Sequence, residues 1–100
     1  MTRRIELRPR ARKDLRDIAD YTDARWGRTQ ARIYLGALAD ALGQIAERPD
    51  AGSDRSDVSA GLRKWRSGEH SIYYRVVEEA VVVSRIVHVR MDLGGVEWER

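Results

Sequence analysis

Residues 9–49 read PRARKDLRDIADYTDARWGRTQARIYLGALADALGQIAERP, and this stretch decides the fold. Apolar and small side chains recur in it at spacings of three and four, which is typical of amphipathic helices. Pro9 suits a first helical turn, Gly27 suits a helix end, and Pro49 disfavours helical backbone at Arg48. The pattern therefore predicts two helices separated by a very short turn, and such helices form an antiparallel hairpin. Trp26 and Tyr34 lie on the apolar stripes, so we expect both in the core.

Strand-like segments flank the helices on both sides. Residues 3–8 alternate polar and apolar side chains around Ile5 and Leu7, which predicts a first short strand. Three later runs also favour strands: Leu62–Arg66, His70–Val77 and Val81–Val89. Residues 49–61 have almost nothing to bury and are expected to form a surface loop. The predicted fold is a single α+β domain over residues 1–100, in the order β-α-α-β-β-β, with the helical hairpin packed on a twisted, mostly antiparallel sheet.

Two-residue turns at Ser67-Gly68 and Glu78-Glu79 would fix the register of the last three strands. The expected opposite pairs are Arg63 with Ile72, Trp65 with His70, Tyr74 with Val83 and Ile72 with Arg85. One sheet face would then carry the apolar set Trp65, Ile72, Tyr74, Val76, Val81, Val83 and Val87 toward the helices, with Arg63 and Arg85 as the two exceptions on it. The other face would be basic, with Lys64, Arg66, Ser71, Tyr73, Arg75, Ser84, His88 and Arg90. A bulge would exchange the faces beyond it.

Composition excludes several classes of protein. Charged residues make up 35% of the 100 residues and hydrophobic residues 42%, which is typical of neither a membrane protein nor a low-complexity disordered chain. The sequence has no Cys and no hydrophobic leader, so we expect a cytoplasmic location. Because His70 and His88 are the two histidines and no glycine-rich phosphate loop is present, no metal and no small-molecule cofactor is expected.

The cationic side chains are almost all arginine. The net charge is +3, and Lys13 and Lys64 are the two lysines among 19 cationic residues. Arginine forms bidentate contacts with carboxylate or phosphate and stacks on aromatic rings, so the charge is compatible with an acidic partner, either protein or nucleic acid.

Short motifs follow one another along nearly the whole chain. They are Asp14–Tyr21 (DLRDIADY), Arg25-Trp26-Gly27 with Gln30-Ala31 and Tyr34-Leu35, Arg48-Pro49 with Gly52, Gly61-Leu62-Arg63, Gly68-Glu69-His70 leading into Tyr74-Arg75, and Arg85–Asp92 (RIVHVRMD). In this order and spacing, the motifs resemble the ParE branch of the RelE/ParE toxins of bacterial type II toxin–antitoxin modules. The fold of that superfamily agrees with the predicted order of elements.

The resemblance implies a toxin that poisons DNA gyrase, as an inhibitor of this topoisomerase rather than as an enzyme, in a module of the kind that stabilises plasmids. It also implies a ParD-like antitoxin that covers the helical hairpin and the sheet in a hetero-oligomer; no membrane contact and no sequence-specific nucleic-acid binding are expected. The residues expected to contact the target are Arg63, Arg75, Arg85, His88 and Arg90. Those expected to contact the antitoxin are Leu15, Ile18, Tyr34, Leu38 and Trp65.

Two other functions stay open. The first is that of the RelE branch, ribosome-dependent cleavage of messenger RNA, which needs a general base, a general acid and cations on the phosphate. Arg63, Lys64, Arg66, Arg75 and Arg85 could bind the phosphate, but residues 91–98 contain neither Tyr nor His, which leaves His88 as the candidate for proton transfer. The second is a plain nucleic-acid-binding module, which needs stacking aromatics. Tyr73 is the only stacking aromatic side chain among the residues predicted on the basic face.

Overall fold

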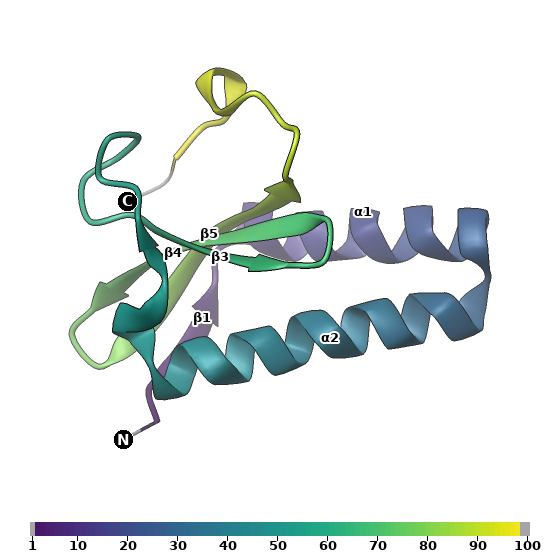
Figure 1. Cartoon of the computed structure of the whole chain (residues 1–100), viewed down its shortest axis with the longest axis horizontal. Coiled ribbons are helices and arrows are strands. Elements are labelled where there is room, and N and C mark those ends of the chain that lie inside the picture. The colour runs from purple at the N-terminus through teal and green to yellow at the C-terminus, as the bar shows by residue number, and fades with distance from the viewer. Residues whose placement is uncertain (1, 99–100) are drawn as a thin grey trace.

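The computed structural model describes residues 2–98, and Figure 1 shows two long helices lying beside a small twisted sheet. The helices are α1 (Pro9–Trp26) and α2 (Arg28–Glu47), and the strands are β1 (Arg4–Leu7), β2 (Ser53–Asp54), β3 (Arg63–Ser67), β4 (His70–Val77) and β5 (Ala80–His88). Two single 3₁₀ turns, η1 (Pro49–Ala51) and η2 (Leu93–Gly95), complete the order. Neither helix is apolar enough along its length to cross a membrane.

The five strands form one mixed sheet in the order β1-β5-β4-β3-β2. β1 runs parallel to β5, and the other neighbours are antiparallel. The predicted α+β fold and the order of the two helices and four longer strands are confirmed, and the two-residue strand β2 lies within the segment predicted as a loop. β1 and β5 can be parallel neighbours because both helices and the strands β2, β3 and β4 lie between them in the chain, which gives the long connection that a parallel pair needs.

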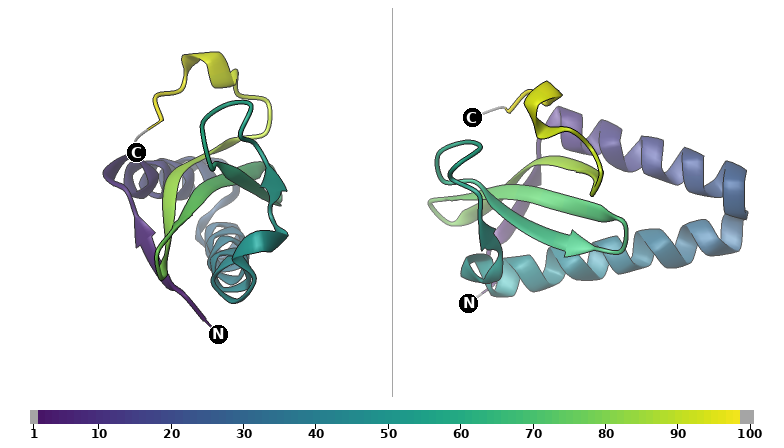
Figure 2. Two further views of the ribbon diagram at one scale, coloured as in Figure 1. Left: turned by 90° about the vertical axis from the view of Figure 1, so that its left-hand side faces the viewer. Right: turned by 45° about the horizontal axis from the view of Figure 1, so that its top comes forward.

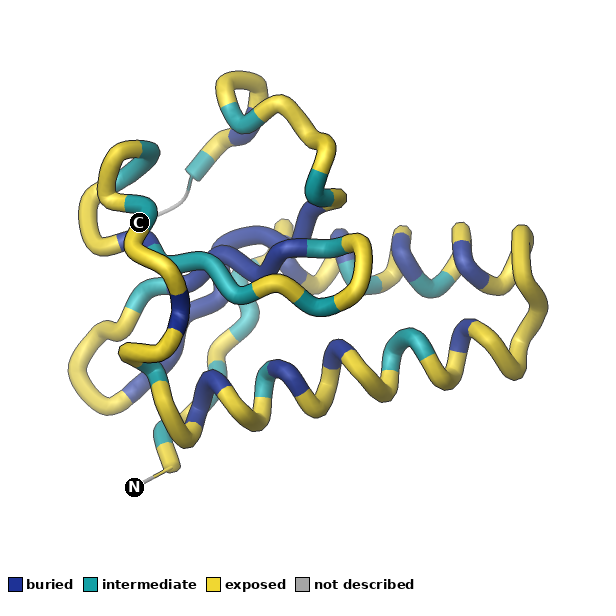
Figure 3. Tube along the Cα trace, in the orientation of Figure 1, coloured by how far each residue is buried: buried dark blue, intermediate teal, exposed yellow. Residues whose placement is uncertain are grey.

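The hairpin covers one face of the sheet, with α1 mainly against β5 and α2 against β3 (Figure 2). The core beneath it consists of Ala11, Ile18, Leu38, Ala41, Ile45, Ile72, Tyr74, Val81, Val83 and Ile86. Figure 3 shows buried positions recurring along the inner sides of both helices, whereas the turn between them is exposed. Helical spacing of the apolar residues therefore does form the core, except where the hairpin extends past the sheet.

A β-bulge between β4 and β5 changes the predicted register. Tyr74 lies opposite Val83, as predicted, but Tyr73 lies opposite Arg85, so Ser84 has no direct partner on β4. The prediction that Ile72 pairs with Arg85 is wrong, because its partner beyond the bulge is Ile86.

The bulge exchanges the faces of the residues that follow it. Ile86 joins the core beneath the helices, whereas Val87, predicted to lie there, packs on the opposite face with Leu62 and Tyr73. By the same shift His88 lies toward α1 and not on the basic face predicted for it.

The β3–β4 hairpin turns one residue later than predicted. Ser67 pairs with His70, so the turn consists of Gly68 and Glu69, and Gly68 adopts a positive φ of 59° that suits glycine. Trp65 therefore lies opposite Ile72, and Arg63 lies opposite Tyr74, in place of the predicted partners. The slip moves each pairing by two residues, so the side chains keep their predicted faces. The predicted turn at Glu78 and Glu79 is confirmed by the pairing of the residues on either side of it.

The second face of the sheet is not an exposed basic surface. Leu62, Tyr73 and Val87 form a small buried cluster there, covered by Val58 of the preceding loop and by Leu93 and Trp98 of the C-terminal segment. The rings of Tyr73 and Trp98 meet edge to face at 5.0 Å between centroids. The segment predicted as a surface loop with almost nothing to bury thus supplies part of a minor core.

A buried ion pair joins α1 to the bulge. The Arg85 guanidinium donates from Nε and Nη2 to the two carboxylate oxygens of Asp14, at 2.8 and 3.0 Å, and Asp14 also accepts from the backbone N–H of Ile86 at 2.9 Å. Both side chains are almost completely buried. Bidentate geometry with a third hydrogen bond satisfies the carboxylate in a place where an unpaired charge would be costly.

We expect Asp14→Asn to lower the free energy of unfolding by about 3–5 kcal/mol, because it leaves the Arg85 charge buried without a counterion. Urea denaturation of the purified protein measures this change. Lys13→Ala is the matched control: it breaks the neighbouring Lys13–Asp17 pair, whose side chains are both exposed, and should change stability little. A double variant, Asp14→Leu with Arg85→Met, should regain much of the loss. An Asp14→Asn variant as stable as the parent would contradict the structural role of the pair.

Candidate functional site

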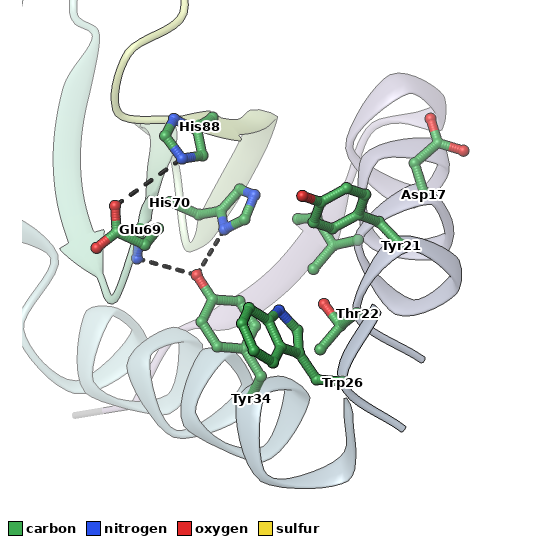
Figure 4. Close-up of a pocket in the computed structure, with 9 residues that line it drawn as sticks. Asp17, Tyr21, Thr22, Trp26, Tyr34, Glu69, His70 and His88 are labelled. Atoms are coloured by element: carbon green, nitrogen blue, oxygen red, sulfur yellow. Dashed lines mark hydrogen bonds and ion pairs between the residues drawn. The ribbon is translucent and has the colours of Figure 1, made fainter. Parts of the chain in front are cut away.

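An open groove of about 490 Å³ lies between α1, the start of α2 and the ends of the strands at the β3–β4 turn (Figure 4). We call it the hairpin groove; the residues that line it are Asp17, Ile18, Tyr21, Thr22, Trp26, Tyr34, Glu69, His70 and His88. Tyr21 and Trp26 are 64% and 62% exposed. Solvent-exposed aromatic side chains that surround a concave surface are typical of an interaction site.

A second recess continues the hairpin groove along α2. It shares Thr22, Trp26 and Tyr34 with the first and is also lined by Ile33 and Gly68. Ile33 is 61% exposed. The two recesses together form one apolar strip, long enough to accept more than one side chain of a partner segment.

The expectation that Trp26 lies in the core is wrong. Its ring is exposed and lies 5.4 Å from the Arg25 guanidinium. α2 has 20 residues and spans about 30 Å, whereas β3, the strand it packs against, has five residues and spans about 17 Å. The hairpin therefore projects beyond the sheet, as Figure 1 shows, and the last turn of α1 has no strand to pack against.

Tyr34 and His70 form the polar floor of the hairpin groove. The Tyr34 hydroxyl accepts from the backbone N–H of Glu69 at 3.0 Å and lies 2.6 Å from Nδ1 of His70. Burial lowers the pKa of His70 below its usual value of 6.5, and the nearby His88 lowers it further. Burial also raises the pKa of Tyr34 above its usual value. The arrangement that uses the hydroxyl hydrogen is the one in which the Tyr34 O–H donates to Nδ1 of His70, because residues 2–98 offer this hydrogen no other acceptor.

His88 completes the polar end of the groove. Its Nδ1 accepts from the backbone N–H of Arg90 at 3.1 Å, and its ring meets that of His70 edge to face at 5.6 Å. Nε2 of His88 lies 3.9 Å from a carboxylate oxygen of Glu69. The bulge in β5 is what brings the two imidazoles together, and it could not be read from the local sequence.

The groove has groups that could transfer protons but lacks a phosphate-binding cation. Two imidazoles, two phenols and two carboxylates line it, and none of its described lining residues is Arg or Lys. Among residues 2–98 there is also no group of three His, Asp or Glu side chains placed to hold a metal ion. This arrangement suits the binding of a largely apolar segment better than it suits phosphoryl chemistry.

The predicted target-binding residues do not form one site. Arg85 is in the buried ion pair with Asp14. Arg63 donates to the carbonyl oxygens of Asp50 and Gly52, at 3.2 and 2.8 Å. Arg75 donates to the Ala60 carbonyl oxygen at 2.9 Å, to Ser84 at 3.2 Å and to Ser59. His88 and Arg90 alone in this set are exposed and adjacent. Their role in target binding stays a prediction.

The predicted antitoxin-binding residues lie mostly on the sheet-facing side of the hairpin. Leu38 is 1% exposed, Ile18 and Tyr34 line the hairpin groove, and Leu15 and Trp65 are half-buried against the core. Sequence reasoning missed Tyr21 and Ile33, which carry most of the exposed apolar surface beside Trp26. The length of the helices relative to the strands was the signal that could have found them.

Most of this sequence is similar to sequences of known proteins. Residues 5–93 match a family model described as ParE toxin of type II toxin–antitoxin system, parDE. A protein named Toxin ParE1 from Mycobacterium tuberculosis H37Rv is 38% identical over 94 residues, which cover 93% of this chain and 96% of that protein. Toxin ParE from Escherichia coli is 36% identical over 89 residues, covering 87% and 85%.

Two solved structures share the fold. One, described as the chromosomal ParDE TA system from P. aeruginosa, has a TM-score of 0.78 at 19% identity and covers 89% of this chain and 98% of that one. The other, described as the toxin–antitoxin complex RelBE2 from Mycobacterium tuberculosis, has a TM-score of 0.62 at 22% identity and covers 88% and 99%.

The lowered pKa of His70 predicts a pH-dependent stability. The folded protein binds this proton more weakly than the unfolded chain does, so the free energy of unfolding should fall as the pH drops through 6.5 and below. His70→Asn should flatten this dependence, because the Asn side chain can still accept from Tyr34 but does not titrate. Urea denaturation between pH 5 and 8 measures the difference, and NMR titration of the His70 ring measures the pKa. Parallel pH profiles for the two proteins would contradict the assignment.

Proposed function

Because the chain belongs to the ParE family of toxins from type II toxin–antitoxin systems, we propose that it poisons DNA gyrase and is neutralised by a ParD-like antitoxin in the cytoplasm. The observation that carries the proposal is the family match over residues 5–93, nearly the whole described chain. Relatives that carry the same name are matched over most of their own length, so the comparison covers a whole toxin and not a shared fragment.

The hairpin groove supports the antitoxin half of the proposal. Tyr21, Trp26 and Ile33 expose apolar surface that an isolated domain of this size ordinarily buries, and a partner segment would remove it from water. An amphipathic helix laid into a groove presents apolar side chains three or four residues apart, which suits two adjoining recesses. We therefore place the antitoxin across α1 and α2, with Ile18 and Tyr34 as contacts in the floor.

For the target half, we place the contacts at His88 and Arg90. Both follow the bulge at the end of β5 and are exposed, whereas Arg63 and Arg75 hold loops and Arg85 lies in the interior. A guanidinium can bind a carboxylate in a bidentate manner, which suits a protein target.

Messenger RNA cleavage of the RelE type is the second candidate function. The observation that favours it is the grouping of Tyr34, His70 and His88 in one groove, since proton transfer needs such side chains. The absence of Arg and Lys from the described lining of the groove weighs against it.

We expect expression without the antitoxin to filament cells and to induce DNA-damage responses while bulk messenger RNA stays intact.

In a supercoiling assay with purified gyrase, Arg90→Glu should weaken inhibition about tenfold or more, because it replaces a cation at the contact with an anion. His88→Gln should have a smaller effect, since glutamine keeps much of the hydrogen bonding. Arg12→Glu, an equally exposed charge reversal on α1, is the control and should inhibit like the parent.

Primer extension on ribosome-associated transcripts separates the two candidates. Loss of a general acid or base typically lowers a rate by about 10²–10⁴-fold. Codon-positioned cuts that disappear in His88→Gln would therefore establish the nuclease and overturn the gyrase proposal.

A further inference from the structure

We propose that the hairpin groove recognises a particular side-chain combination in the antitoxin: apolar residues one helical turn apart, with an Asp or Glu whose carboxylate accepts a hydrogen bond from Nε2 of His70. This inference rests on the antitoxin half of the proposed function and specifies its chemistry.

The hydrogen bonds of the groove floor favour one tautomer of His70, with the proton on Nε2. The Tyr34 hydroxyl accepts from the backbone N–H of Glu69, so its own hydrogen is available for Nδ1 of His70, 2.6 Å away. With Nδ1 as the acceptor, the proton of the neutral ring is on Nε2. Figure 4 shows that this nitrogen is directed into the groove, toward α1. No residue of the described chain, 2–98, accepts a hydrogen bond from it.

A partner that fills the groove must provide an acceptor for this N–H. Ile18, Tyr21 and Trp26 form apolar walls, so a docked segment would exclude water from Nε2. A donor buried without an acceptor loses its hydration with no compensation. A carboxylate is the strongest acceptor that a protein side chain offers, and hydrogen bonds to it are about twice as strong as neutral ones. The groove therefore selects an acid placed beside apolar anchors.

The carboxylates of the groove itself leave this position open. Asp17 pairs with Lys13 at 2.9 Å, and Figure 4 shows its carboxylate pointing away from His70. Glu69 extends to the far side of the β3–β4 turn, where its carboxylate faces Nε2 of His88. Because the described lining of the groove has these two carboxylates and no Arg or Lys, the acid is recognised through the His70 N–H and not through a cation of the groove.

The two adjoining recesses set the spacing of the anchors. Trp26 lines both recesses and separates the Tyr21 end from the Ile33 end. Residues three or four apart on a helix project from the same face about 5–6 Å apart, so two such side chains can enter the two recesses on either side of Trp26. The solved structures that share this fold are toxin–antitoxin assemblies, which favours the antitoxin over the target as the occupant.

Selection from a random peptide display library on the immobilised full-length toxin tests this chemistry, because such a library favours no side-chain combination at the outset. We expect enriched peptides to carry two apolar residues at a spacing of three or four and one Asp or Glu at a fixed position. Replacing that acid by its amide should weaken binding about tenfold. Trp26→Ala should abolish binding of the whole pool.

Two substitutions at His70 make a matched pair. His70→Asn keeps an acceptor for Tyr34 but removes the donor at the Nε2 position, whereas His70→Gln places an amide N–H near that position. His70→Asn should bind the selected acidic peptide about tenfold more weakly and should no longer discriminate acid from amide. His70→Gln should retain most of the affinity. Circular dichroism confirms that each variant is folded before binding is compared.

Several results would overturn the inference. They are a selected pool without a fixed acid, an acid that remains equally favoured on His70→Asn, and failure of the purified cognate antitoxin to compete with the acidic peptide. None of these depends on gyrase, so a toxin that leaves gyrase unaffected but passes the peptide tests refutes the target half of the proposed function alone.

Discussion

The buried ion pair between Asp14 and Arg85 fixes how the helical layer lies on the sheet. One carboxylate accepts two guanidinium N–H groups and the backbone N–H of Ile86, so it holds α1, the bulge and the rest of β5 with three hydrogen bonds. The bulge in turn decides which side chains of β5 face the helices. Ile86 enters the core, and His88 reaches the hairpin groove beside His70. The compositions of the second core cluster and of the groove both follow from the register beyond the bulge.

The sequence predicted what depends on local periodicity and failed where distant residues decide. The helices and the order of the longer strands follow from spacings of two, three and four, and the pairing of Tyr74 with Val83 follows from a two-residue turn. The bulge has no such signal, because Ser84 and Arg85 are not the glycine that often marks a bulge and the carboxylate that holds Arg85 is 71 positions away. The exposure of Trp26 likewise depends on where the sheet ends. The groove was therefore predicted only through Ile18, Tyr34 and His88, and His88 was assigned to the wrong face.

Three arginine side chains of the sheet, Arg63, Arg75 and Arg85, hydrogen-bond within the protein. Arg63 holds the carbonyl oxygens of the segment after α2, and Arg75 holds the loop before β3 against β5. Tyr74 adds to this from the core: its hydroxyl donates to the Pro49 carbonyl oxygen at 2.8 Å and accepts from the N–H of Gly52 at 3.1 Å. A residue 52 with a Cβ would overlap that hydroxyl, which explains glycine at this position. Polar contacts of this kind order a loop that has few apolar side chains, and charge alone could not distinguish them from partner contacts.

The projection of the helical hairpin beyond the sheet divides its residues into those constrained by core packing and those that are not. Residues at the free end, such as Tyr21, Trp26 and Ile33, contribute little to the core, so substitutions there leave folding intact and alter only which partner is bound. Residues closer to the sheet, such as Leu38 and Ile45, are constrained by packing. The free end of the hairpin can thus change its surface by a few substitutions while the packed scaffold stays the same.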